Sequence, residues 1–243
     1  MSEARTPTAA HPEGEGATAV VPRAPLWVVA AAAAAVVALL VAVLIGSEVL
    51  EKPLLVFLVE PQSDGSDPWY AGVVSTTGAL LWWTAATVSY VTAWIARATG
   101  AGHAGFWLGM AALSTALAFD DLYQGHEYVV PTFLHLSEHV TVTVYAVTLV
   151  ALIAANRSYV RTLPWRIGLT ALIFFAISEA IDYRNEQDEL WAEMLFLEEG
   201  TKLAGIAAWA LFFVWGSQSV LLGRGSTTSK SEARSATPQG FPP

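Results

Sequence analysis

Carboxylate and imidazole side chains gather near the ends of long apolar runs in this chain. They come from four segments that are distant in the sequence, and several of them are spaced three, four or seven residues apart. Such spacings place side chains on one face of a helix, so these segments present their polar groups together. The side chains are Asp120, Asp121, His126, Glu127, His135, Glu138, His139, Glu179, Asp182, Glu198 and Glu199.

Oxygen and nitrogen ligands are the only strong metal ligands here, because the chain has no cysteine. Such ligands suit a divalent ion, with Zn, Mn and Fe as the candidates. We therefore predict a metal site that activates water in a hydrolase-like reaction, with Glu127 or Glu179 as the general base. The expected metal ligands are drawn from Asp120, Asp121, His126, His135, Glu138, His139, Glu198 and Glu199.

Established catalytic and nucleotide-binding signatures are absent from the sequence. It contains no H-E-x-x-H, P-loop, G-x-G-x-x-G or G-x-S-x-G motif, so neither nucleotide binding nor serine hydrolysis is predicted. The formal net charge of -9 also argues against a nucleic acid partner, because there is no basic surface to neutralise phosphates.

The elements that position these groups are predicted to be membrane-spanning helices. The chain is 54% hydrophobic and only 14% charged, which is too apolar for an ordinary soluble domain. A span needs roughly 20 apolar residues, and six runs approach or reach that length. They are Leu26–Ile45, Tyr70–Ala96, Phe106–Gln124, Phe133–Ala155, Trp165–Asp182 and Glu199–Leu222. The sequence thus predicts an all-α, multi-pass protein of the cell membrane, with membrane lipid as its partner.

The basic residues predict that both termini are cytoplasmic. Short cytoplasmic loops retain lysine and arginine, and of the 12 basic residues only Lys52, Arg184 and Lys202 then fall on the outer side. Residues 25–222 form the predicted six-helix domain. Residues 1–24 and 223–243 are rich in small and polar residues, and we expect both to be disordered cytoplasmic tails.

Glu179 is the acid whose place in the membrane needs most explanation. A carboxylate at mid-bilayer costs about 2.5–3.5 kcal/mol on insertion scales, so we expect Glu179 to face the bundle interior. A metal, a histidine or Lys202 would be its partner, within one cavity at the outer boundary. Two alternatives stay open: a proton-coupled transporter with Glu179, Asp120 and Lys202 as a titratable relay, and a structural or partner-binding subunit whose polar cluster ties helix ends together.

Two short motifs resemble those of a widespread group of uncharacterised bacterial multipass membrane proteins. The first is Asp120-Asp121-x4-His126-Glu127, and the second is Glu198-Glu199-x2-Lys202-x2-Gly205. The resemblance covers the third to sixth predicted spans. It implies a multipass membrane protein in which these residues are prominent, and it implies no particular reaction.

Overall fold

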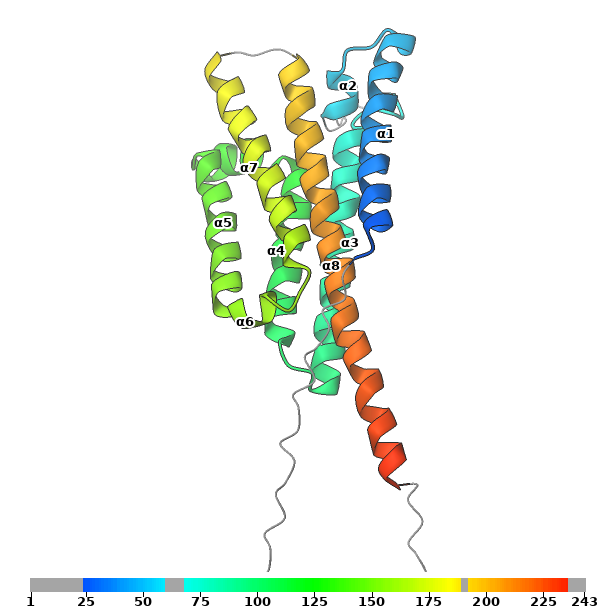
Figure 1. Cartoon of the computed structure of the whole chain (residues 1–243). Helices are drawn as coiled ribbons and strands as arrows, with labels where there is room; N and C mark the ends of the chain where they lie inside the picture. The colour runs from blue at the N-terminus through cyan, green and yellow to red at the C-terminus, as the bar shows by residue number, and fades with distance from the viewer. Residues whose placement is uncertain (1–23, 60–67, 189–191, 236–243) are drawn as a thin grey trace, which may run out of the picture.

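The computed structural model describes residues 24–59, 68–188 and 192–235, and all regular secondary structure within them is helical (Figure 1). The all-α class predicted from the sequence is confirmed. The elements are α1 Leu26–Leu50, α2 Leu55–Leu58, α3 Val73–Thr99, α4 Ala104–Tyr123, the π-helix η1 Gly125–Leu134, α5 Glu138–Ala155, α6 Arg157–Val160, α7 Trp165–Asp188 and α8 Ala192–Ser235.

Each of the six predicted apolar runs lies in or overlaps one long helix: α1, α3, α4, α5, α7 and α8. These helices run alternately up and down in Figure 1. In the part of the chain that the structure describes, three of them, α1, α3 and α5, are long and apolar enough to cross a membrane.

Helix ends follow local backbone chemistry. Gly100 ends α3 with φ 65°, a left-handed conformation that glycine adopts at little cost. Gln124 ends α4 in the same region, at φ 51°, and the chain turns there into η1. At the other end of the chain, α8 continues to Ser235, past the boundary at residue 222 after which we expected a disordered tail. No proline occurs between Pro164 and Pro238, so nothing in this stretch sterically stops the helix.

The core lies between α3, α4, α7 and α8. Trp82, Trp107, Trp209 and Phe213 are buried there, and the Trp209 indole N–H donates a hydrogen bond to Ser114 Oγ at 3.0 Å. By contrast, α1 and α5 are peripheral. Val43 is the only buried residue of α1, and α5 has none.

Candidate functional site

The end of α4 carries two buried acids. Asp120 and Asp121 are only 8% and 6% exposed. Because the chain reverses at Gln124 and enters η1, His126 returns toward α4, and its Nδ1 contacts Asp120 Oδ2. Glycine at position 125 lets the start of η1 pass close to Asp120. A Cβ at this position would overlap Asp120 Oδ1 and lie 3.0 Å from Asp120 Cα. Irregular helical turns of this type are frequent at functional sites.

Both oxygens of Asp120 have partners on other elements. The Tyr145 hydroxyl of α5 donates to Asp120 Oδ1 at 3.2 Å, while His126 of η1 holds the second oxygen. The carboxylate therefore links α4, η1 and α5. Buried polar groups that are satisfied in this way hold their helices in one arrangement.

Asp121 binds a lysine from α8. Lys202 Nζ lies 2.9 Å from Asp121 Oδ1 and 3.6 Å from Glu199 Oε1. The second oxygen, Asp121 Oδ2, is buried with no hydrogen-bond partner among the described residues. A Cβ on Gly78 of α3 would lie 3.2 Å from this oxygen, so glycine is what allows α3 to pass so close to the carboxylate.

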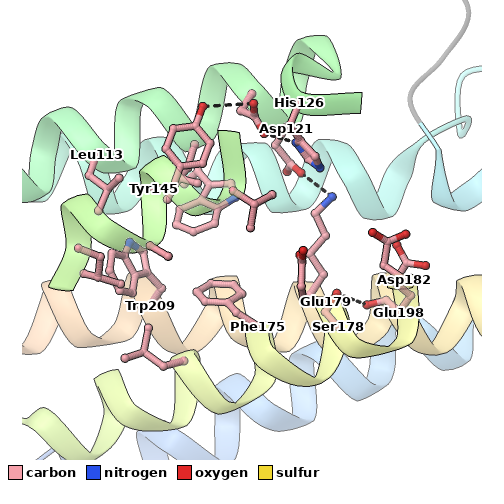
Figure 2. Close-up of a pocket in the computed structure, with 18 residues that line it drawn as sticks. Leu113, Asp121, His126, Tyr145, Phe175, Ser178, Glu179, Asp182, Glu198 and Trp209 are labelled. Atoms are coloured by element: carbon pink, nitrogen blue, oxygen red, sulfur yellow. Dashed lines mark hydrogen bonds and ion pairs between the residues drawn. The ribbon is translucent and has the colours of Figure 1, made fainter. Parts of the chain in front are cut away.

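Further polar groups come from α7 and α8. Ser178 donates a hydrogen bond to the Glu198 backbone carbonyl at 3.1 Å and so ties the two helices together. Figure 2 shows Glu179, Asp182 and Glu198 at the same end of the cavity, opposite the end where Trp209 and Leu113 lie.

These groups line one cavity of about 270 Å³ between α3, α4, α5, α7 and α8. Its deep end is aromatic: the Trp82 ring is stacked on Phe175 at 5.5 Å between centroids and meets Trp209 edge-on at 6.0 Å. Ala146 of α5 lines the cavity and is itself exposed, so the cavity opens beside α5. The lining is Trp82, Leu113, Leu117, Asp120, Asp121, His126, Val142, Tyr145, Ala146, Leu149, Leu172, Phe175, Ser178, Glu179, Asp182, Glu198, Lys202 and Trp209.

Six of the eleven residues singled out from the sequence line this cavity: Asp120, Asp121, His126, Glu179, Asp182 and Glu198. Glu199 does not line the cavity, but its Oε1 lies 3.6 Å from Nζ of Lys202, which does line it. The side chain of Glu127 lies outside what the structure describes.

The polar face that opens α5 lies elsewhere. His135, Glu138 and His139 do not line the cavity. His135 is exposed at the end of η1, and His139 Nδ1 lies 3.9 Å from Glu138 Oε1 with its side chain 55% exposed. The sequence analysis began this span at Phe133, whereas η1 continues to Leu134 and α5 begins at Glu138. Among the described residues, no three His, Asp or Glu side chains are grouped closely enough to hold a metal ion.

The sequence reasoning did not single out Tyr145 or Ser178. Tyr145 follows Glu138 by seven residues, which is the spacing that marks one helix face, and it is a polar group within an apolar run. That spacing was the available signal. Ser178 precedes Glu179 directly, but a serine in an apolar helix most often bonds its own backbone, so its type alone did not mark it.

Comparison with known proteins identifies a family. The family model for DUF8692, described as a domain of unknown function, matches residues 24–215, and the chain belongs to this family. The matched region includes both sequence motifs and the whole cavity lining. No curated protein and no solved structure matches the chain.

Proposed function

We propose that this DUF8692 protein crosses the cell membrane six times with both termini in the cytoplasm, and that its cavity binds a lipid-like amphiphile from the extracytoplasmic leaflet. The alternating helix directions support six spans (Figure 1). The positions of the arginines support cytoplasmic termini. At the end of the bundle away from the acidic end of the cavity, four arginines lie in or beside α3, α6 and α7: Arg97, Arg157, Arg161 and Arg166. Short cytoplasmic loops carry this excess of arginine.

The observation that carries the binding proposal is the division of the cavity into two ends. Carboxylates, Lys202 and His126 line one end, and Leu113, Phe175 and Trp209 line the other. A water-soluble ligand would gain little from the aromatic end, and a purely apolar one would place apolar groups against the charged end. An amphiphile matches both ends, with its head group at the acids and the start of its chain along the rings.

Access from the membrane also supports an amphiphile. α5 packs against α4 and η1 with no residue buried, and the cavity reaches the surface at Ala146 on this helix. A lipid-like molecule could pass sideways beside α5 without leaving the bilayer. Beyond the cavity, Phe106, Trp107 and Phe213 are fully buried, so the opposite half of the bundle is packed with aromatic side chains. This packing favours binding from one side over a transport path.

Hydrolysis of the bound amphiphile is a second proposal, favoured by the contact between Asp120 and His126. A carboxylate on Nδ1 orients an imidazole and raises the basicity of its other nitrogen, which suits either a general base or a metal ligand. Glu179 lines the same cavity, as a general base would have to. A divalent metal would need Lys202 to leave Asp121, because this pair occupies one carboxylate oxygen.

A cavity-filling substitution tests the binding proposal. Ala146→Phe puts a ring at the cavity opening, whereas Ala151→Phe puts the same ring on the exposed surface of α5 away from the cavity. The probe is 9,10-dibromostearyl alcohol in nanodiscs, whose bromines quench Trp82 and Trp209. We expect a saturable quenching component in the native protein and in Ala151→Phe that Ala146→Phe removes. Equal saturable quenching in all three proteins, or none in the native protein, overturns the proposal.

The hydrolytic proposal has a separate test. His126→Gln and His139→Gln remove one imidazole each, from inside and outside the cavity respectively. Elemental analysis of the purified protein measures bound zinc, manganese and iron. A stoichiometric metal that is lost in His126→Gln and retained in His139→Gln supports metal-dependent chemistry. If the native protein contains no stoichiometric metal, the metal-dependent form of the proposal fails.

A further inference from the structure

We infer that a groove between α1, α7 and α8 binds one acyl chain of an anionic phospholipid, and that Arg166 binds the phosphate of that lipid. The groove has a volume of about 380 Å³ and is lined from residues 29–40, 167–174 and 196–211. It shares no lining residue with the cavity, so it is a second site. Its assignment to the cytoplasmic leaflet rests on the topology proposed above.

The groove follows from how three helices pack. α8 lies between α1 and α7 and packs against both (Figure 1). Its lining residues include Gly200, Ala204 and Ala208, which are four apart and share one helix face. A Cβ on Gly200 would lie 3.2 Å from Leu40 Cδ1, so α1 closes on α8 at that level. The groove is therefore a slot that runs along α8 with α1 and α7 as its walls.

The lining selects an apolar occupant. Its only polar side chains are Thr170 and Thr201, and both hydroxyls donate to the backbone of their own helix. Thr170 donates to the Arg166 carbonyl at 3.0 Å, and Thr201 donates to the Leu197 carbonyl at 2.9 Å. A polar molecule in the groove would lose its hydrogen bonds to water without replacement, whereas a hydrocarbon chain loses none.

The width of the groove selects among apolar occupants. Its lining on α8 runs from Phe196 to Leu211, which is about 22 Å of helix. A volume of about 380 Å³ over that length gives a mean cross-section of about 17 Å². A helix with its side chains is about 10 Å across, or about 80 Å², whereas a hydrocarbon chain is only about 4 Å across. The groove therefore fits one acyl chain and not a helix of a second copy or of a partner.

A basic side chain stands at one end of the groove. Arg166, Thr170 and Phe174 are spaced four apart on α7, so Arg166 lies one turn beyond Thr170 on the face that lines the groove. Arg166 is exposed, with its guanidinium carbon 5.7 Å from the centroid of the Trp165 ring. Within the described ranges no carboxylate forms an ion pair with it. A guanidinium in this setting is complementary to a phosphate.

Two tryptophans place this end of the groove at the level of the lipid head groups. Trp27 and Trp165 are 71% and 47% exposed. Each precedes by two residues the first lining residue of its helix, Val29 on α1 and Ile167 on α7. Exposed tryptophans of spanning helices lie at the membrane interface. In the proposed topology this interface is cytoplasmic, where anionic lipids give the membrane surface its negative potential.

Competition between two lipids with the same chains tests the head group. The full-length protein, delipidated in detergent, is mixed with equal amounts of dioleoyl phosphatidylglycerol and dioleoyl phosphatidylcholine, and native mass spectrometry counts the bound copies of each. We expect phosphatidylglycerol to bind about fivefold more tightly, which corresponds to about 1 kcal/mol for one arginine. Arg166→Gln should remove this preference. Arg157→Gln, on the exposed surface of α6 and outside the groove, should retain it. No preference in the native protein, or one that survives Arg166→Gln, overturns the inference.

A cavity-filling pair locates the acyl chain. Ala33→Phe puts a ring into the groove, whereas Ala31→Phe puts the same ring on the nearly opposite, exposed face of α1. We expect Ala33→Phe to weaken phosphatidylglycerol binding at least tenfold, and Ala31→Phe and the cavity variant Ala146→Phe to leave it unchanged. Equal binding in all three variants overturns the inference.

Two other outcomes would assign the groove or the lipid differently. Loss of phosphatidylglycerol in Ala146→Phe and not in Ala33→Phe would place the lipid in the cavity, which refutes this inference and supports the binding proposal. A native mass of two copies that Ala33→Phe reduces to one would make the groove an interface between copies, and would also refute it. Failure of the quenching test for the cavity leaves this second site unaffected, because the two sites share no residue.

Discussion

The ion pair between Asp121 and Lys202 gives the sharpest test of how the bundle is held together. Lys202→Met keeps the length and apolar stem of the side chain and removes the charge. Asp121, whose side chain is 5% exposed, is then left without its cation. At the observed 2.9 Å, Coulomb's law with an effective dielectric constant of about 20 gives roughly 6 kcal/mol of attraction. Desolvation of both ions offsets much of this.

Breaking such a pair on one side costs about 3–5 kcal/mol, because the remaining charge stays buried. For a chain of this size, each kcal/mol lowers the melting temperature by about 2–4 °C, so Lys202→Met should lower it by about 6–20 °C. The assay is thermal unfolding in detergent, followed by loss of the monodisperse peak in gel filtration. Lys52→Met is the matched control, since Lys52 is exposed and should shift the melting temperature by little.

The double variant Asp121→Asn/Lys202→Met distinguishes a charge effect from lost packing. If the buried charge is responsible, Asp121→Asn should restore a large part of the stability that Lys202→Met removes, and the cycle should show a coupling energy well above 0.5 kcal/mol. Two results would refute the reasoning: strictly additive effects of the two substitutions, or a Lys202→Met protein that melts with the Lys52→Met control.

Three further substitutions test individual contacts by thermal unfolding. Gly125→Ala should destabilise by about 1–3 kcal/mol because its Cβ would overlap the Asp120 carboxylate; a native melting temperature would show that η1 does not close on α4 as described. Tyr145→Phe should cost about 0.5–1.5 kcal/mol, since it removes the hydroxyl that donates to Asp120 and keeps the ring, and no change would mean that this bond contributes nothing. Gly205→Ala should also cost about 1–3 kcal/mol, because a Cβ there would lie 2.7 Å from the Phe175 ring and force α7 from α8; an unchanged melting temperature would contradict that close packing.

Hydropathy alone determined a large part of this helical architecture. Six apolar runs predicted six long helices, and each lies in or overlaps one of them, because a run of about 20 apolar residues has few other stable states in a membrane. The cost of a charge in a membrane predicted that Glu179 faces the bundle interior; it lines the cavity, and the residue is nevertheless exposed. Hydropathy also placed Asp120 and Asp121 at the end of the third span, and both line the cavity, whereas His126 reaches it because the chain reverses at Gln124.

Which side chains meet across helices was decided only by the tertiary structure. Spacing in the sequence tells which residues share a face of one helix. The rotation of each helix and the choice of its neighbours are set by packing. For example, Gly78 leaves room for the Asp121 carboxylate, and Gly205 leaves room for the Phe175 ring. That packing brings Lys202 of α8 into an ion pair with Asp121 of α4.

The same limit explains the histidines of the fourth predicted span. The spacing of His135, Glu138 and His139 predicted one helix face, yet α5 begins only at Glu138 and none of these three residues lines the cavity. η1 packs against α4, where Gly125 approaches Asp120, and against α5, and the spacing of residues along one helix does not predict such packing. The sequence therefore determined the helices and the kinds of groups at their ends, and the packing between helices determined which of those groups share one cavity.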